Sequence, residues 1–464
     1  MDKMIWKTKQ IETALSVKIL PNGGYGKIQF NSKNVEEGDL FIALAGKRDG
    51  HDFVIDALER GASAAIVSKD IIGVPKNKLI KVGNTLEALS LLSEYKRSIS
   101  KAKIIAVTGS VGKTSTKEAI KIMLSAYGNV HASYGTFNNS LGVQLTLASM
   151  PDNTEYAIIE MGMSAKGELS AISNKVIPDI AVITTISEGH LEFFNSVKEI
   201  ADAKCEIFEG LDINQGIAII NRDIDLYSRC LKNIDSTRLK NVQSFGTHKD
   251  AGVRFVSHEL LQDNCTRLLY LVADESIEII INNIIPIHLA ENFAASFAVV
   301  HALDLDLESA ATAISEYEVL LGRGRLISVD RENKSYRIIC DYYNSNPQSL
   351  QASLEHFTQF PDENKIAILG NMAELGSEEL SLHKRMIPYI VNSGVSKLFL
   401  VGNIMQQIKD DIPSNILIRY YHDVDALIKE IDSYIKGGEL IFVKGSRGVQ
   451  LEKLAKHLGV KDVI

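Results

Sequence analysis

The chain has 464 residues, of which 45% are hydrophobic and 23% charged, so it can bury several cores and is not a disordered protein. Its formal net charge of −8 disfavours nonspecific nucleic-acid binding. Four scattered cysteines, a polar N-terminus and the lack of an apolar run near the ~20 residues that cross a bilayer favour a cytoplasmic protein without disulfides, signal peptide or membrane span.

Residues 1–97 predict a small α/β domain. Strands are expected at 38–44 and 64–67, and a helix at 53–60 is expected to end before a glycine. The loop at 46–52 is rich in polar groups. A ligand site and a solvated turn are equally compatible with it.

The strongest local signal is a short apolar run at 104–107 followed by the glycine-rich segment Gly109–Ser115. A strand, a glycine turn and a helix N-terminus expose unpaired backbone N–H groups, which bind anions. This order predicts a phosphate loop for a nucleoside triphosphate, with Lys113 on the outer phosphates and the Thr114 hydroxyl on magnesium. The alternative is an ordinary strand-to-helix turn.

Two further polar side chains stand at the ends of apolar strands. Glu160 closes the predicted strand 156–161, and a lone buried carboxylate is costly unless it is paired or metal-bound. His190 follows the predicted strand 180–185. Because ligands gather at the carboxyl ends of parallel strands, Thr114, Glu160 and His190 are candidates for one site.

The predicted helix 196–211 carries Lys204 in the middle of an apolar stripe formed by Ile200, Ile207 and Phe208. Burial would lower the pKa of this lysine, and a neutral amine can add carbon dioxide to become an anionic carbamate. Periodicity alone favours the alternative, a lysine that extends its ammonium group to solvent.

The second predicted domain covers residues 98–325. At 253–285 its hydrophobic pattern changes to short alternating runs, which predict antiparallel strands added to a parallel sheet. His288 and Asn292 then lie one turn apart on one face of a helix. The domain is expected to close at a hinge near Gly322–Arg325, where guanidinium groups could clamp phosphate.

Residues 326–464 alternate between strand and helix patterns, which predicts a third, doubly wound domain. Polar loops follow three of its strands, at 341–347, 370–376 and 445–448. They could form one site, or could be the ordinary turns of an α/β domain.

Taken together, these motifs resemble those of the Mur ligase family, the ATP-dependent amide-bond-forming enzymes of bacterial cell-wall synthesis. The resemblance covers essentially the whole chain and depends on ten segments: Thr108–Ser115, Phe137–Gly142, Glu160–Gly162, Gly167–Glu168, His190–Glu192, Ala203–Phe208, Gly322–Arg323, Tyr343–Pro347, Gly370–Gly376 and Lys444–Arg447. The Tyr-Asn-Ser-Asn-Pro context is similar to family members that add D-alanyl-D-alanine to UDP-N-acetylmuramoyl-tripeptide, and argues against those that add the third residue.

The resemblance implies roles for individual residues. ATP contacts are expected from Gly109, Ser110, Val111, Gly112, Lys113, Thr114, Ser115, Asn292, Arg323 and Asp341. Two magnesium ions are expected on Thr114, Glu160, His190 and a carbamylated Lys204, which reverses the interpretation from periodicity. Lys113, His190 and Lys204 would be catalytic. UDP-sugar contacts are expected from Ser32, Gly46, Asp49, His51, Asn138 and Asn139, and dipeptide contacts from Tyr343, Asn346, Glu374 and Arg447. On the residues alone, Asn138 and Asn139 could equally be turn residues.

The resemblance also implies an α/β fold of three domains: a UDP-sugar domain (1–97), a phosphate-loop ATP domain with a parallel sheet plus a small antiparallel sheet (98–325), and a Rossmann-like dipeptide domain (326–464). It implies an acyl-phosphate intermediate and a monomeric cytoplasmic enzyme. Five positions depart from the family's usual residues without removing a metal ligand or the phosphate lysine: Thr185, Ser187, Cys340, Tyr342 and Asn371.

Two alternatives remain open. A folylpolyglutamate synthetase shares the ATP domain but begins almost directly at the phosphate loop, whereas about 100 residues precede the loop here. The other alternative is a non-catalytic or switching phosphate-loop protein that binds nucleotide and a partner.

Overall fold

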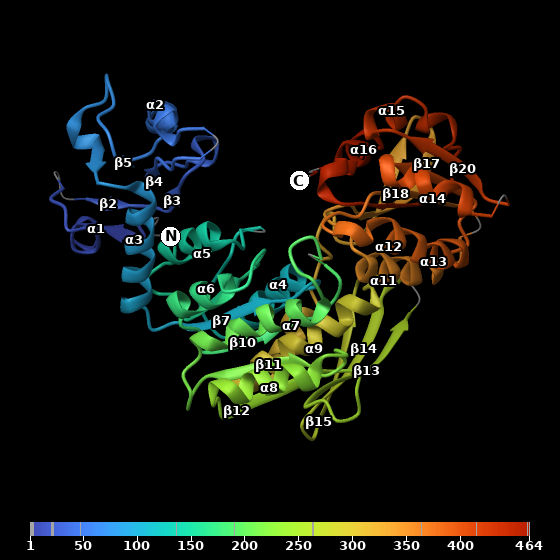
Figure 1. Cartoon of the computed structure of the whole chain (residues 1–464), viewed down its shortest axis with the longest axis horizontal. Coiled ribbons are helices and arrows are strands. Elements are labelled where there is room, and N and C mark those ends of the chain that lie inside the picture. Colours follow the sequence, from blue (N-terminus) through green and yellow to red (C-terminus); the bar gives the residue numbers. More distant parts are fainter. Residues whose placement is uncertain are drawn as a thin grey trace.

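The computed structural model describes residues 4–19, 23–46, 48–135, 137–189, 191–261, 264–362, 364–413, 415–461 and 463. Figure 1 shows three lobes, which we call N-terminal (blue, upper left), central (cyan to yellow, below) and C-terminal (orange to red, upper right). Each lobe has its own parallel or mainly parallel sheet. Among the described residues, no helix combines the length and apolar character that a membrane crossing requires.

The N-terminal lobe is built on a four-stranded parallel sheet in the order β3 (Ile28–Gln29), β4 (Leu40–Ile42), β5 (Ala64–Val67), β6 (Leu79–Lys81). Its other elements are the antiparallel pair β1 (Trp6–Lys7) and β2 (Gly24–Tyr25), and the helices α1 (Thr8–Leu15), α2 (Val54–Glu59) and α3 (Thr85–Ile99). The indole of Trp6 donates to the carbonyl of Ala148 at 2.8 Å, and buried Lys96 forms an ion pair with Asp152. These contacts fix the lobe to the central one.

The central lobe contains a nine-stranded sheet in the order β15-β14-β13-β12-β11-β10-β7-β9-β8. The strands are β7 (Lys103–Thr108), β8 (Val130–Ala132), β9 (Tyr156–Glu160), β10 (Ile180–Ile183), β11 (Ile217–Asn221), β12 (Asn241–Gly246), β13 (Val253–Leu260), β14 (Thr266–Val272) and β15 (Glu275–Ile281). All neighbours pair in parallel except β13–β14 and β14–β15, which are antiparallel. The predicted antiparallel addition is therefore confirmed.

Two cores cover the two faces of this sheet. One includes residues of α4 (Lys113–Leu124), α9 (Ile287–Ala302) and α10 (Leu307–Ile314). The other includes residues of α5 (Ser140–Ala148), α6 (Glu168–Val176), α7 (Val197–Cys205) and α8 (Tyr227–Thr237). The strands that carry the predicted phosphate loop and Glu160, β7 and β9, are neighbours near one edge.

The C-terminal lobe has a six-stranded sheet in the order β16 (Arg325–Arg331), β17 (Lys334–Asp341), β21 (Leu440–Lys444), β18 (Lys365–Gly370), β19 (Lys397–Val401), β20 (Leu417–Tyr421). Only β16–β17 is antiparallel. Cores that include α11 (Pro347–Thr358), α12 (Glu379–Arg385), α13 (Ile387–Asn392) and α14 (Asn403–Ile408) on one face, and α15 (Val424–Ile428) and α16 (Leu451–His457) on the other, confirm the predicted double winding.

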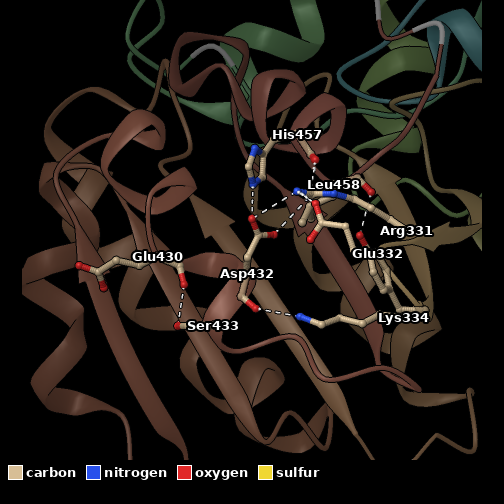
Figure 2. Close-up of polar contacts among 9 residues, drawn as sticks. Arg331, Glu332, Lys334, Glu430, Asp432, Ser433, His457 and Leu458 are labelled. Carbon is tan, nitrogen blue, oxygen red and sulfur yellow. Dashed lines mark hydrogen bonds and ion pairs between the residues drawn. The ribbon is translucent and has the colours of Figure 1, made fainter.

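A polar cluster around Asp432 fastens the β16–β17 hairpin to the rest of this lobe (Figure 2). The carboxylate of Asp432 accepts a hydrogen bond from Arg331 Nη1 at 3.2 Å and lies 2.9 Å from His457 Nε2. Lys334 Nζ donates to the Asp432 backbone carbonyl at 3.3 Å. One carboxylate thus joins the hairpin to α16.

Some boundaries differ from the sequence expectation. The helix predicted at 196–211 is α7 followed by a 3₁₀ turn at Glu206–Gly210. The Glu206 carboxylate accepts the backbone N–H of Gly167 at 2.8 Å, at the start of α6, and so serves a neighbouring helix. The strand predicted at 38–44 is only β4, Leu40–Ile42.

Candidate active site

A cleft of about 580 Å³ lies between the central and C-terminal lobes and contains the predicted phosphate loop. Two glycines make this loop possible. Gly109 has φ +154°, and a Cβ there would lie 1.9 Å from Thr184 Oγ1. Gly112 has φ +84°, and a Cβ there would lie 2.7 Å from Asn292 Oδ1. Only glycine lets the backbone pass this close to β10 and α9.

Lys113 and Thr114 occupy the first turn of α4, directly after the loop. Lys113 Nζ donates to the carbonyl of Gly109 at 2.6 Å, so the lysine folds back over the loop. Burial lowers its pKa, while the Glu160 carboxylate raises it. Thr114 Oγ1 accepts a hydrogen bond from Arg323 Nη2 at 3.1 Å. A cation, a hydroxyl and the N-terminus of α4 thus meet in the cleft, which suits a phosphate chain.

Glu160 ends β9 with its side chain 1% exposed. Its Oε1 accepts a hydrogen bond from Asn138 Nδ2 at 2.9 Å, and its Oε2 is buried without a hydrogen-bond partner among the described residues. An unpaired buried carboxylate oxygen is costly, and hard cations such as Mg²⁺ prefer oxygen ligands. The carboxylate of Glu160 and the hydroxyl of Thr114 both line the cleft and fit such an ion.

The side chain of Lys204 is only 1% exposed, so the interpretation of a lysine extended to solvent is wrong. Burial lowers its pKa well below the ordinary value, and the nearby Lys113 lowers it further. Both effects favour the neutral amine, which is the form that reacts with carbon dioxide. His190, the fourth predicted metal ligand, lies outside the described residues. Within the described chain, no three His, Cys, Asp or Glu residues are grouped as a metal site.

The three predicted polar loops of the C-terminal lobe all reach the cleft. Asp341, at the end of β17, accepts hydrogen bonds from Lys444 Nζ at 2.7 Å and from Ser353 Oγ at 2.6 Å. Asn346 is extended (φ −139°) and caps α11 by accepting the backbone N–H of Ser349 at 2.8 Å. The caps and pairs hold this wall of the cleft in one conformation.

The cleft brings together most of the predicted site residues, namely Ser110, Val111, Gly112, Lys113, Thr114, Ser115, Asn138, Asn139, Glu160, Asn292, Arg323, Asp341, Tyr343, Asn346, Glu374 and Arg447. Asn139 also caps α5 by accepting the backbone N–H of Gly142 at 2.9 Å, so the turn interpretation describes part of its role. Asn221, Glu291 and Lys444 also line the cleft, and no sequence pattern predicted a role for them. The sequence pattern could have indicated Lys444, because it is a cation at the end of an apolar strand.

Four predicted UDP-sugar residues, Ser32, Gly46, Asp49 and His51, belong to the N-terminal lobe and do not line this cleft. Asp49 and His51 form their own polar group there. Asp49 Oδ1 lies 2.6 Å from His51 Nδ1, and Lys69 Nζ donates to Asp49 Oδ2 at 2.7 Å. The hydrogen bonds from Lys69 and His51 lower the pKa of the Asp49 carboxyl.

Known proteins match this chain over nearly its whole length. The sequence matches the Mur ligase family catalytic domain over residues 25–97, the Mur ligase middle domain over 107–300 and the Mur ligase glutamate ligase domain over 324–447. It is 44% identical to the UDP-N-acetylmuramoyl-tripeptide--D-alanyl-D-alanine ligase of Rickettsia prowazekii, over 98% of this chain and 100% of that relative.

Solved structures agree with the sequence comparison. A crystal structure of MurF from Acinetobacter baumannii superposes with a TM-score of 0.82 at 25% identity, covering 98% of each chain. The MurF ligase of Thermotoga maritima in complex with ADP superposes with a TM-score of 0.76 at 25% identity, covering 93% of this chain and 96% of that one. The chain belongs to the Mur ligase family.

Proposed function

We propose that this protein is the ATP-dependent ligase that attaches D-alanyl-D-alanine to UDP-N-acetylmuramoyl-tripeptide, a step in making the peptidoglycan precursor of the cell wall on which cell shape and division depend. The name of the 44% identical relative supports the substrates, and the ADP complex of the Thermotoga maritima ligase supports the nucleotide. The structural observation that carries the proposal is the unpaired buried oxygen of Glu160 in the cleft of the phosphate loop. A folylpolyglutamate synthetase is disfavoured by the full-length match to the dipeptide-adding ligase.

The order of the reaction steps follows from the low reactivity of the substrate carboxylate toward an amine. A carboxylate is a poor acyl donor at neutral pH, so its oxygen first attacks the γ-phosphorus of ATP, which gives an acyl phosphate and ADP. The dipeptide amine then attacks the carbonyl carbon, and the tetrahedral intermediate expels phosphate. Lys113 and Arg323 would neutralise charge on the transferred phosphoryl group. Closing the cleft would exclude water from the acyl phosphate.

Magnesium would be held by Thr114 and Glu160, with His190 and a carbamylated Lys204 as the ligands of a second ion. Bound there, the ions would screen the charge of the phosphate chain. Support for the carbamate is the burial of Lys204 and the lowered pKa of its amine. Its direct test is a carbamate signal in the ¹³C NMR spectrum of protein equilibrated with ¹³C-bicarbonate, and loss of that signal in Lys204→Ala.

We assign the UDP-sugar to residues 1–97, ATP to 98–325 and the dipeptide to 326–464, with the hinge near Gly324, in a monomeric cytoplasmic enzyme. Gly324 has φ +98° and precedes β16, so it suits a position where backbone angles change. The free thiols of Cys205, Cys230 and Cys340 are compatible with a reducing compartment. Solution scattering should show compaction when nucleotide and both substrates are added, and unchanged dimensions would contradict the hinge.

The decisive assay follows ADP release with UDP-N-acetylmuramoyl-tripeptide, ATP and D-alanyl-D-alanine. We expect turnover only when all three are present with magnesium. No ADP release would favour the non-catalytic nucleotide-binding alternative, and ADP release that does not depend on the dipeptide would favour a switching phosphate-loop protein that hydrolyses ATP.

A further inference from the structure

Two arginine side chains lie over the ring of Tyr343 inside the cleft. The guanidinium carbon of Arg323 lies 4.1 Å from the ring centroid, and that of Arg447 lies 5.5 Å from it. Arg447 Nη1 also donates to the Tyr343 hydroxyl at 3.4 Å. Guanidinium groups within about 6 Å of an aromatic ring are held by cation–π attraction.

The two arginines come from opposite sides of the cleft. Arg323 lies at the end of the central lobe, between α10 and β16, and donates to Thr114 Oγ1 in the phosphate loop at 3.1 Å. Arg447 belongs to the loop after β21 in the C-terminal lobe. Tyr343 lies between them in the loop after β17, and its backbone N–H donates to the Gly322 carbonyl at 3.0 Å. The tyrosine is therefore attached to the chain segment that bears Arg323.

The contact between Arg323 and Thr114 is expected to change when the site is filled. The Thr114 oxygen that accepts from Arg323 is the same oxygen that would bind magnesium, and the ion would repel the positive guanidinium, so we expect Arg323 to release it. The side chain of Arg323 is only half-buried, and once released it would be free to sample solvent. The ring of Tyr343 keeps the guanidinium beside the phosphate loop at a low entropic cost.

We propose that Tyr343 is a positioning residue that links the phosphate half of the cleft to the acceptor half, by holding Arg323 at the phosphate loop and Arg447 at the acceptor loop. This inference rests on the proposed function for the identity of the acceptor. It differs from a simple contact of Tyr343 with the dipeptide, because it predicts that removing the ring also weakens nucleotide binding.

The ring and the hydroxyl can be separated by mutation. Tyr343→Phe keeps the ring under Arg323 and removes only the hydroxyl that faces Arg447. Tyr343→Leu removes both. The matched control is Tyr227→Leu, because Tyr227 on α8 carries Arg222 at 4.3 Å in the same kind of pair and does not line the cleft.

The test measures kcat, KM for ATP and KM for D-alanyl-D-alanine in the three variants, with magnesium-ADP affinity by calorimetry. We expect Tyr343→Leu to raise both KM values and the ADP Kd by about three- to tenfold. Tyr343→Phe should raise KM for the dipeptide and leave KM for ATP within about twofold. Tyr227→Leu should change neither.

The proposal would be overturned if Tyr343→Leu left KM for ATP and the ADP Kd unchanged. It would also be overturned if Tyr343→Phe raised KM for ATP as much as Tyr343→Leu does. If Tyr343→Leu does not fold, the split between the two KM values in Tyr343→Phe decides alone. The proposed function fails separately: wild-type protein would then show no dipeptide-dependent turnover, while the effect of Tyr343→Leu on ADP binding would still test the Arg323 contact.

Discussion

Asn138 Nδ2 donates a 2.9 Å hydrogen bond to Glu160 Oε1 and leaves Oε2 of the same carboxylate buried without a partner among the described residues. A Cβ on Gly162 would lie 2.8 Å from Asn138 Oδ1, so the amide fits tightly over the end of β9. The pair is thus a carboxylate oriented by one oxygen and available through the other. This arrangement suits a ligand for a cation rather than a core contact.

Glu160→Gln should lower dipeptide-dependent ADP release by about 100-fold or more, because the amide keeps the acceptor for Asn138 but removes the negative charge that holds magnesium. The melting temperature should stay the same or rise, since the unpaired buried charge is gone. The exposed Glu94→Gln is the control. An active Glu160→Gln enzyme would exclude this carboxylate as a metal ligand.

Lys204→Ala should also lose activity, and a short carboxylic acid such as acetate should restore part of it by occupying the place of the carbamate. The exposed Lys121→Ala, with a side chain 48% exposed on α4, should remain active with and without the acid. Assays at increasing acetate concentration measure the rescue. Full activity of Lys204→Ala in the absence of acid would mean that the lysine holds no metal.

Stability at acidic pH should depend on His356, which is 3% exposed and packs edge-to-face on Phe360. Burial, with a smaller effect of His288, lowers its pKa from 6.5 to about 3; His258 also lowers it, and Gln359 and Asp341 raise it. In the unfolded chain this imidazole becomes protonated below about pH 6.5, whereas in the folded chain it stays neutral down to about pH 3. The free energy of unfolding is therefore highest above pH 6.5 and falls as the pH drops toward 3.

His356→Leu should remove about 1.4 kcal/mol per pH unit from this dependence within that range. Urea unfolding at pH 7 and pH 5 measures the change, with the exposed His422→Leu as control. An identical pH dependence in wild type and His356→Leu would show that this imidazole is not kept neutral by the fold.

Asp432→Ala tests the cluster in Figure 2, which lies outside the cleft. The variant loses the carboxylate that joins Arg331 to His457, and a loss of about 1–2 kcal/mol of unfolding free energy is expected. Both KM values should be unchanged. A large change in KM with unchanged stability would assign the cluster a role in catalysis instead.

The sequence predicted those residues of the candidate site that lie close together in the chain or at the end of a strand. Gly109, Gly112, Lys113 and Thr114 lie within one short segment of the chain, and Glu160 stands at a strand end, so position alone pointed to them. The role proposed for Lys204 rests on the family resemblance, and periodicity did not predict its burial, because helical periodicity places a side chain on a face but does not show whether its tip reaches water.

Other contacts required the tertiary structure. Asp341 and Lys444 are register partners on β17 and β21, which are adjacent in the sheet although three strands and their helices separate them along the chain. The Lys444–Asp341 ion pair follows from that pairing. The meeting of Arg323, Tyr343 and Arg447 likewise depends on how the central and C-terminal lobes pack, which no local pattern encodes.

The most direct test of the account labels the carboxylate of UDP-N-acetylmuramoyl-tripeptide with ¹⁸O and follows the oxygen by mass spectrometry. Formation of an acyl phosphate transfers one carboxylate oxygen to phosphorus, so each phosphate released during D-alanyl-D-alanine addition should carry one ¹⁸O. Phosphate without label, in a reaction that still forms the amide bond, would contradict the proposed intermediate.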